Sequence, residues 1–202
     1  MSMTPSYHLM RNTYYLQLNF IRKVFADEWA KRQMLDAFTE EKSGTDICVY
    51  AFCILDDSFR LALAADHSEF LTVKQFIRRS LSGFGRTAEL LPGDEECLRP
   101  EYTQHLQACR ITRAAELLSV IRYIHLIPST ELCCMTAFDY WWTSFSEYRQ
   151  RYHWPLLSID PVLSMIGAGD PSKLQEFVET HRRLERAGNP VPSCLLMKAS
   201  AA

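Results

Sequence analysis

The hydrophobic and polar positions in the first half of the chain alternate between a strand pattern and a helix pattern. Tyr7 to Leu18, "YHLMRNTYYLQL", is alternating and rich in aromatic residues, which predicts a strand. From Ile21 to Phe38 the apolar residues recur every three or four positions, which predicts an amphipathic helix that ends at Ser43 and Gly44. Ile47 to Leu55 then reads as a second strand.

The polar turn "DDS", residues 56–58, joins this second strand to a third, Phe59 to Ala64, so the two predict a hairpin. Aspartate is favoured in such turns because its side chain bonds to the local backbone. Ser68 has the character of a helix N-cap, and apolar residues follow it at helical spacing from Phe70 to Phe84. We therefore predict a second amphipathic helix there.

The second half of the chain predicts one more strand and three helices. Tyr102 to Ile111 has strand character. Thr112 opens a helix with one apolar face, which we expect to stop before Pro128. Two shorter helical stretches follow, at Pro161 to Ile166 and at Pro171 to Arg186.

The order strand, helix, strand, strand, helix, strand predicts an α+β fold of the ferredoxin-like βαββαβ type, with an antiparallel sheet and its helices on one face. We expect residues 1–128 to form this domain and residues 129–187 to form a C-terminal aromatic and helical extension packed on it. Residues 188–202 are expected to be a disordered tail. Because this fold supports unrelated functions, the function has to be argued from a site.

Composition and charge narrow the class of protein. The 202 residues are 48% hydrophobic, which is enough for one sizeable core. Neither a membrane span of about 18 apolar residues nor a signal peptide is visible, so we expect a cytoplasmic protein. The seven cysteines lack metal-ligand spacing, which favours reduced, mostly buried thiols. With a net charge of −2, any binding to nucleic acid would require a local basic patch.

Three segments of the sequence carry a more specific signal of function than its composition does. They are residues 24–63, "VFADEWAKRQMLDAFTEEKSGTDICVYAFCILDDSFRLAL", residues 120–134, "VIRYIHLIPSTELCC", and residues 138–149, "FDYWWTSFSEYR". In this order they resemble the REP-associated tyrosine transposases, a family of HUH single-tyrosine transposases. The resemblance runs from about Tyr7 to about Gly167 and implies a DNA transposase or single-strand nuclease.

The chemistry of that family requires two histidines at positions i and i+2 of one strand, in a hairpin that typically reads "MPNHVHLLL". Side chains at this spacing point to the same face, so both imidazoles can bind one divalent metal that polarises the scissile phosphate. A tyrosine on a following helix then attacks the phosphorus and holds the DNA as a covalent phosphotyrosine.

This sequence departs from the family at each of these positions. Its hairpin reads "LDDSFRLAL", which places Ser58 and Arg60 where the histidines would be, and the chain contains no His-x-His pair. Serine is a poor metal ligand, and a guanidinium is none because it stays protonated. The family helix "RRYVRYFNR" corresponds to "RRSLSGFGR", which places Ser80 at the tyrosine position, and no tyrosine occurs between Tyr50 and Tyr102. We therefore expect no catalytic residue, no bound metal and no other cofactor.

Two replacements for the lost groups are weaker hypotheses. Asp56 and Asp57 could form a new metal site, but adjacent aspartates diverge on an extended turn and are ordinary turn residues. Ser80 could act as a nucleophile, but no base lies near it in the sequence. Its spacing from Ile77 and Phe84 points it toward the sheet, as a packing residue would be.

Basic residues suggest that DNA binding is retained. A guanidinium at the metal position can itself pair with a phosphate as a bidentate donor. The candidate DNA-binding residues are Arg60, Lys74, Arg78, Arg79 and Arg86. The alternative is that those on the helix are merely its solvated face. The loop of residues 89–101 carries five acidic residues where the family is basic, which favours a changed partner.

The hypothesis we favour is a catalytically inactive, transposase-derived protein that binds a DNA site, hairpin or single strand and regulates transcription in the bacterial nucleoid. The aromatic residues 138–148 could stack on unpaired bases, although such clusters are more often core. Two alternatives stay open: a protein-interaction module that uses the acidic loop 89–101 and aromatic surface, and an active DNA-nicking transposase. We expect no membrane partner.

Overall fold

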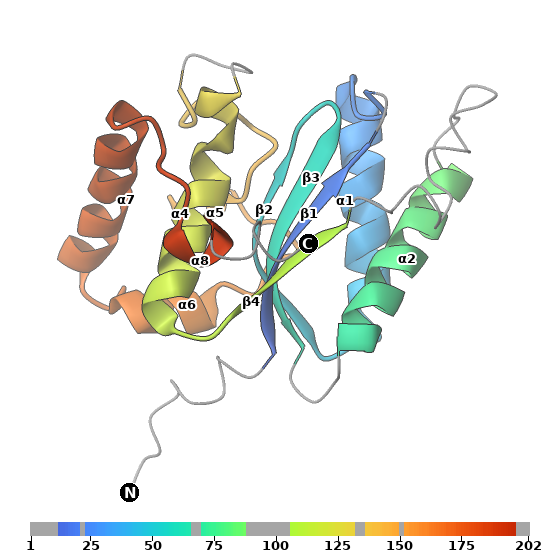
Figure 1. Ribbon diagram of the computed structural model, residues 1–202, viewed down its shortest axis with the longest axis horizontal. Coiled ribbons are helices and arrows are strands. Elements are labelled where there is room, and N and C mark those ends of the chain that lie inside the picture. Colours follow the sequence, from blue (N-terminus) through green and yellow to red (C-terminus); the bar gives the residue numbers. More distant parts are fainter. Residues whose placement is uncertain are drawn as a thin grey trace, which may run out of the picture.

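A four-stranded antiparallel sheet lies between two groups of helices (Figure 1). The structure, a computed structural model, describes residues 12–20, 23–65, 70–87, 106–131, 136–149 and 152–196. The elements in chain order are β1 (Thr13–Asn19), α1 (Glu28–Lys42), β2 (Ile47–Ile54), β3 (Ser58–Ala65), α2 (Phe70–Thr87), β4 (Gln107–Ile111), α4 (Ala114–Thr130), α5 (Phe145–Tyr148), α6 (Asp160–Ile166), α7 (Pro171–Arg186) and α8 (Ser193–Leu196).

The sheet confirms the predicted α+β fold. Its strand order is β2-β3-β1-β4, and each neighbouring pair is antiparallel, as the βαββαβ arrangement requires. The hairpin of β2 and β3 lies where it was predicted. β1 begins at Thr13, and the earlier part of its predicted range lies outside the described residues, as do Ser68, the acidic loop 89–101 and residues 102–105.

A side-chain cap sets the start of α1. The carboxylate of Asp27 accepts a hydrogen bond from the backbone N–H of Ala30 at 2.7 Å, which satisfies one of the free donors at the helix start. Residues 24 and 25 before it lie in a turn. The predicted helix start at Ile21 was therefore too early, because apolar spacing alone does not show where the cap lies.

α1 and α2 cover one face of the sheet with interlocking aromatic rings. Phe38 of α1 meets Phe59 of β3 and Phe76 of α2 edge-on, with ring centroids 4.8 and 5.3 Å apart. All three rings are buried. This apolar layer is the larger core of the domain.

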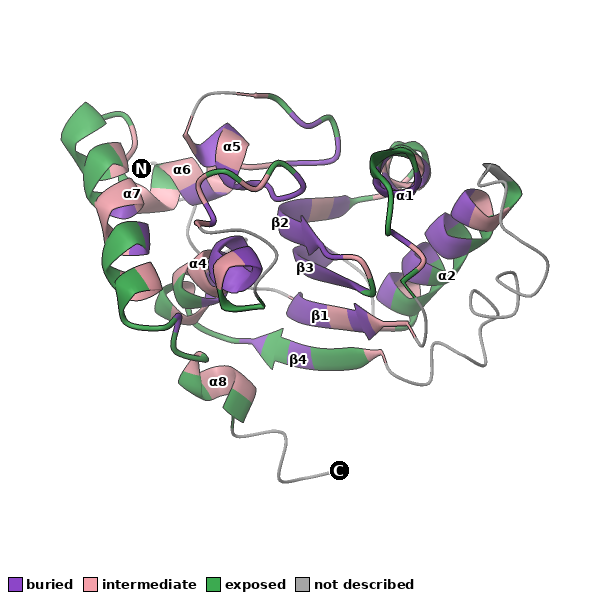
Figure 2. Cartoon of the chain, turned by 90° about the horizontal axis from the view of Figure 1, so that it is seen from above, coloured by how far each residue is buried: buried purple, intermediate pink, exposed green. Residues whose placement is uncertain are grey.

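α4 covers the other face of the sheet, and α7 packs on α4 from outside (Figure 2). α4 continues to Thr130, so the prediction that it stops before Pro128 was wrong. A proline inside a helix removes one N–H donor, but here the last turn gains other bonds. The hydroxyls of Ser129 and Thr130 donate to the backbone carbonyls of Leu126 and Ile127 at 2.8 and 2.9 Å.

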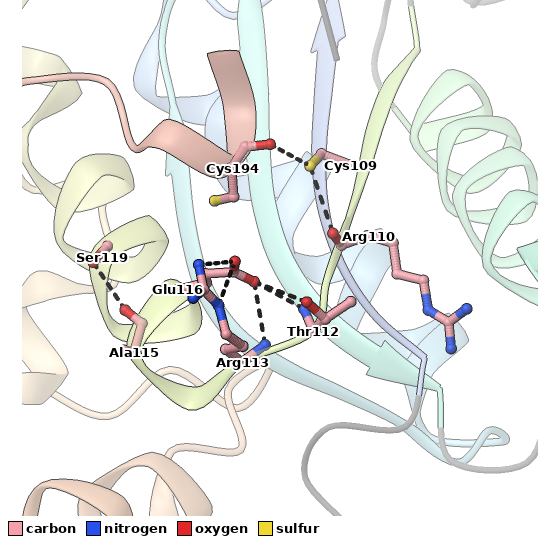
Figure 3. Close-up of polar contacts among 8 residues, drawn as sticks. All are labelled: Cys109, Arg110, Thr112, Arg113, Ala115, Glu116, Ser119 and Cys194. Carbon is pink, nitrogen blue, oxygen red and sulfur yellow. Dashed lines mark hydrogen bonds and ion pairs between the residues drawn. The ribbon is translucent and has the colours of Figure 1, made fainter. Parts of the chain in front are cut away.

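One carboxylate fixes the junction between β4 and α4 (Figure 3). Glu116 accepts from the backbone N–H groups of Thr112 and Arg113 at 3.1 and 3.2 Å. The Nε of Arg113 donates to its other oxygen at 2.8 Å. Two donors at the start of the helix are thereby satisfied, which holds α4 at a fixed angle to the sheet.

The chain just beyond α7 is packed against the domain. The side chain of Asn189 is buried and donates to the carbonyl of Tyr123 at 3.2 Å. In Figure 3 the thiol of Cys109 points toward α8, where it donates to the carbonyl of Cys194 at 3.2 Å. Residues 188–196 of the expected tail are therefore in contact with α4 and β4. No disulfide joins the cysteines of the described residues, which are Cys48, Cys53, Cys109 and Cys194.

The aromatic residues 138–148 are mainly core, as the commoner behaviour of such clusters suggested. Phe145 and Tyr148 are buried, whereas Trp141 is 48% exposed. This segment also pairs with the outer edge of β2, where the backbone N–H of Ser144 donates to the carbonyl of Phe52 at 3.0 Å. It therefore shields that edge strand from solvent.

Two buried histidines join α4 to α7. The Nδ1–H of His181 donates to the carbonyl of Phe177 at 2.9 Å, so its Nε2 accepts the Nδ1–H of His125 at 3.0 Å. The Nε2 of His125 then accepts the hydroxyl of Ser144 at 2.8 Å. These bonds fix one neutral tautomer for each ring. Burial is the main cause that lowers the pKa of His125 well below its usual value and that of His181 to about 3.

This pair predicts a loss of stability in mild acid. Each histidine has a pKa near about 6.5 in the unfolded chain but is neutral when folded, so below that pH the unfolded state binds more protons. The histidine contribution to the free energy of unfolding should be complete above about pH 6.5 and decrease as the pH falls toward the lower folded-state pKa. Urea unfolding between about pH 7.5 and pH 4 measures this slope.

The matched variants are His181→Gln and Thr180→Ala. Thr180 is next to His181 on α7 and has no titratable side chain, so its replacement should leave the acid slope unchanged. His181→Gln should flatten the slope. A slope that is the same in both variants would show that the buried pair does not set the acid sensitivity.

Candidate nucleic-acid interface

Ser58 and Arg60 lie on β3 and point to the face of the sheet that α4 covers. Strand alternation requires this, because Phe59 and Leu61 belong to the core under α1 and α2. Ser58 is 3% exposed and Arg60 is 6% exposed. The Nη1 of Arg60 donates to the Oγ of Ser58 at 3.1 Å, so the two side chains are in direct contact.

Glu131, at the C-cap of α4, balances the charge of Arg60. The Nη2 of Arg60 donates to the Oε1 of Glu131 at 2.7 Å. Burial alone would lower the pKa of the guanidinium, but Tyr15 and Glu131 raise it, and Arg60 stays a cation. The strand position where the resemblance implies a metal thus holds a fixed positive charge with a carboxylate partner.

Two tyrosines lie beside this ion pair. Burial raises the pKa of Tyr15 on β1 and of Tyr123 on α4, and the charge of Arg60 opposes the rise in both. The hydroxyl of Tyr15 donates to the side chain of Gln17 at 3.0 Å, and Gln17 donates to Asn19 at 3.0 Å. This end of the sheet face is therefore polar, in contrast to the apolar layer under α1 and α2.

Ser80 lies on the opposite side of the sheet. It is on α2, has no exposed surface, and donates its hydroxyl to the carbonyl of Phe76 at 3.0 Å. A group on α2 cannot reach Ser58 or Arg60 through the sheet, so the three positions that the resemblance aligns with the metal ligands and the nucleophile do not form one site. The packing role weighed for Ser80 fits its burial, and Tyr123 is the tyrosine on α4 that lies near Arg60.

The candidate basic residues also separate into groups. Lys74 and Arg78 are one helical turn apart on α2 and line a groove beside β4. Arg79 turns toward α1, where its Nη1 lies 3.3 Å from the Oε1 of Glu41. Arg86 is exposed in the last turn of α2. Arg60 is not part of this surface, because it lies on the other face of the sheet.

The groove between α2 and the edge strand β4 has a volume of about 630 Å³. Phe70, Leu71 and Leu106 contribute apolar lining, and Lys74 lies over the ring of Phe70 with its Nζ 5.0 Å from the centroid. α2 contains no acidic residue. The groove therefore combines apolar surface with the positive charge of Lys74 and Arg78, which no carboxylate of α2 balances, and this suits a ligand that is negatively charged.

Asp56, weighed as a replacement metal ligand, is paired with lysines. The Nζ of Lys31 donates to its Oδ1 at 3.0 Å, and the Nζ of Lys23 lies 3.8 Å from its Oδ2. Lys31 is itself buried. These cations neutralise the carboxylate and disfavour a metal ion beside it.

Sequence reasoning missed the groups that surround Arg60. Glu131 is 71 positions away, and Tyr123 lies in the segment "VIRYIHLIPSTELCC", in which the sequence singled out no site residue. Their proximity depends on how α4 crosses the sheet, which no local pattern encodes. The usable signal was Arg60 itself, because a charge inside a strand that is buried on both faces requires a partner.

Comparison with known proteins gives a structural likeness. The chain is similar to a solved structure of the REP-associated tyrosine transposase bound to a REP hairpin, with a TM-score of 0.55 and 16% sequence identity. The match covers 79% of this chain and 90% of that chain. No family model and no curated protein matches the sequence. The likeness confirms the fold that the sequence resemblance implied. No helix in the described ranges is long and apolar enough to cross a membrane.

The Arg60 and Glu131 pair predicts an asymmetric effect of mutation. Glu131→Ala leaves a buried guanidinium without its carboxylate and should lower the free energy of unfolding by about 1–3 kcal/mol, discounted for the partial exposure of Glu131. Arg60→Met removes the charge but keeps apolar bulk, and the Glu131 side chain is already 39% exposed. It should therefore cost less than Glu131→Ala, and the double variant should behave like Arg60→Met.

Urea unfolding measures all three variants. Glu41→Ala, which breaks the exposed pair with Arg79, is the matched control and should cost less than about 1 kcal/mol. If Arg60→Met proved more destabilising than Glu131→Ala, the buried charge would not be what makes Glu131 necessary.

Proposed function

We propose that this protein binds DNA on a transposase-like scaffold without cleaving it, and that it regulates transcription by doing so. The observation that carries the proposal is the ion pair of Arg60 and Glu131, at the strand position where the resembling family binds its catalytic metal. The guanidinium of Arg60, a cation that belongs to the protein, stands in the place of a metal ion that would be taken up from solution.

Electrostatics supports the loss of catalysis. A divalent cation at Ser58 would lie within contact of the Arg60 guanidinium, and the two positive charges would repel each other. Tyr123 offers a hydroxyl on the same face, but burial raises its pKa, which weakens it as a nucleophile. Without a metal to polarise a phosphate, its attack has no electrophilic assistance.

Three observations support DNA as the partner. The solved transposase of similar fold is, by its description, bound to a REP hairpin. Lys74 and Arg78 present two adjacent positive charges on a helix that has no acidic residue. Arg86 adds an exposed positive charge in the last turn of α2. Arg79 adds another, because its side chain is 67% exposed although it pairs with Glu41. Phosphate contacts of this kind give affinity that depends on salt.

A protein partner is the second candidate function, and exposed aromatic residues favour it. Trp29 on α1 is 49% exposed and Trp141 is 48% exposed. Trp141 contacts Tyr152, with ring centroids 5.0 Å apart, and Arg32 on α1 interacts with Tyr152, which raises the pKa of Arg32. Tryptophan, tyrosine and arginine are the residues that dominate binding energy at protein interfaces. The acidic loop 89–101 predicted to contact a partner lies outside the described residues.

The DNA hypothesis predicts enriched genomic sites and a salt-sensitive affinity. Chromatin immunoprecipitation with sequencing should identify sites, and fluorescence anisotropy on one of them should give a falling affinity as salt rises. The double variant Lys74→Ala, Arg78→Ala should reduce the salt slope by about 2 and weaken binding. Lys173→Ala with Arg182→Ala, on exposed ion pairs of α7, is the matched control.

The outcomes separate the two candidates. Absence of enriched sites, or an affinity that ignores both salt and the α2 variant, would reject DNA. If Trp29→Ala with Trp141→Ala then abolished capture of a partner that co-purifies with the wild-type chain, the protein-interaction function would replace it.

The loss of catalysis predicts no covalent chemistry on DNA. Wild-type protein incubated with a single-stranded hairpin and Mn²⁺ or Mg²⁺ should give neither nicked DNA nor a protein–DNA adduct on a denaturing gel. Tyr123→Phe should behave identically. A metal-dependent adduct that Tyr123→Phe abolishes would instead establish an active transposase. The variant Ser58→His, Arg60→His tests where the activity was lost, because it restores two imidazoles to one strand face.

A further inference from the structure

The contact between Arg60 and Glu131 uses only part of the guanidinium. The Oε1 of Glu131 accepts a hydrogen bond from Nη2, and the Oγ of Ser58 accepts one from Nη1. The Nε of Arg60 is buried and makes no hydrogen bond within the described part of the chain. The Nε–H and one N–H of Nη2 are parallel and form the two-donor fork to which carboxylates and phosphates bind with two oxygens. Glu131 therefore satisfies half of this fork.

The neighbouring polar groups leave Nε without an acceptor. The Tyr15 hydroxyl donates its proton to Gln17 at 3.0 Å, and its oxygen, which interacts with the Arg60 side chain, makes no hydrogen bond to Nε. Ser58 accepts from Nη1 on the far side of the guanidinium from Nε. A buried donor without a partner costs free energy, so the fork is stabilised by any ligand that brings two acceptor oxygens.

Glu131 is also the exposed member of the pair. Its side chain is 39% exposed, whereas that of Arg60 is 8% exposed. Arg60 is anchored in the middle of a sheet, between β1 and β2, whereas Glu131 lies at the end of a helix with its carboxylate partly in water. Movement of this one side chain would open the fork from the solvent side.

We propose that the Arg60 fork is an oxyanion site that Glu131 holds closed, and that a phosphate group opens it by replacing the Glu131 carboxylate. A phosphate brings two oxygens to Nε and Nη2, where Glu131 brings one, and the displaced carboxylate is solvated. The ligand is a phosphate oxyanion, either free or part of a nucleic-acid backbone. Glu131 then sets the threshold for binding, because the phosphate has to compete with a carboxylate that is always present.

Thermal unfolding of the full chain in inorganic phosphate tests the site, with chloride used to match ionic strength. Glu131→Gln keeps the size of the side chain but removes its charge, so it should bind phosphate at least about tenfold more tightly than wild type. Adding Arg60→Met to this variant should abolish the gain. Glu179→Gln, which neutralises a carboxylate paired with the exposed Arg182 on α7, should leave phosphate binding unchanged. Equal phosphate affinity in Glu131→Gln and Glu179→Gln would overturn the proposal.

A second measurement does not depend on the stability of any variant. In the wild-type chain, phosphate should shift the ¹H–¹⁵N signal of the Arg60 Nε–H, which Arg60→Met identifies by its loss. An Arg60 signal that does not move at saturating phosphate would also overturn the proposal.

DNA anisotropy with Glu131→Gln distinguishes the two sources of phosphate, and this arm alone rests on the proposed function. Tighter DNA binding, with a salt slope steeper by about 1, assigns the site to the nucleic-acid backbone. Tighter binding of inorganic phosphate without any change toward DNA assigns it to a free phosphate compound. That second result supports the oxyanion site while counting against DNA as its ligand.

Discussion

β3 is buried on both faces, and the rest of the structure depends on this constraint. All eight residues of the strand are shielded from solvent, by α1 and α2 on one side and by α4 on the other. A polar side chain on such a strand cannot reach water, so its partner has to come from a neighbouring element. Arg60 meets this requirement through Ser58 on its own strand and through Glu131 at the end of α4. The path of α4 across the sheet is therefore tied to a single charge.

The two faces of the sheet are buried by different kinds of side-chain contact. Under α1 and α2 the contacts are rings against rings, such as Phe38 with Phe59 and Phe76, which specify shape but no chemistry. Under α4 the apolar core is interrupted by bonded polar groups, including the Arg60 pair and the histidines His125 and His181. A polar group in a core has to be satisfied in one geometry, so this face is more sensitive to single substitutions and to pH.

The sequence predicted most of the fold because the fold follows from local periodicity. The strand patterns around Asp56 and Asp57 and the helical spacing after Phe70 are read from neighbouring residues, and both were found where expected. The errors lay at helix ends, which periodicity does not define: the Asp27 cap sets the start of α1, and α4 continues past Pro128 to Thr130. The site was less predictable. Two positions on one strand, Ser58 and Arg60, were correctly expected to share a face.

Ser80 shows why the rest of the site could not be predicted. The alignment with the family helix predicts that Ser80 belongs to the same site as Arg60. The order of the layers in the fold shows instead that the sheet lies between the two residues. The same layer order brings Tyr123 and Glu131 to Arg60 from the far end of the chain. Contacts between elements that are distant in sequence carry the chemistry here, and hydrophobic periodicity contains no information about them.

The separation of the two faces also explains how such a site can change while the fold persists. The ring layer under α1 and α2 does not contact Ser58 or Arg60, so substitutions at these two positions leave the larger core intact. On the α4 face, such substitutions change whether the neighbouring groups have to balance a positive or a negative charge. Metal ligands there would need nearby groups that tolerate a divalent cation, whereas a guanidinium needs an anion. Glu131 at the C-cap supplies that anion at a partly exposed position, where a carboxylate loses less hydration than it would inside the core. The buried cation and its partly exposed anion therefore balance each other at this end of the sheet.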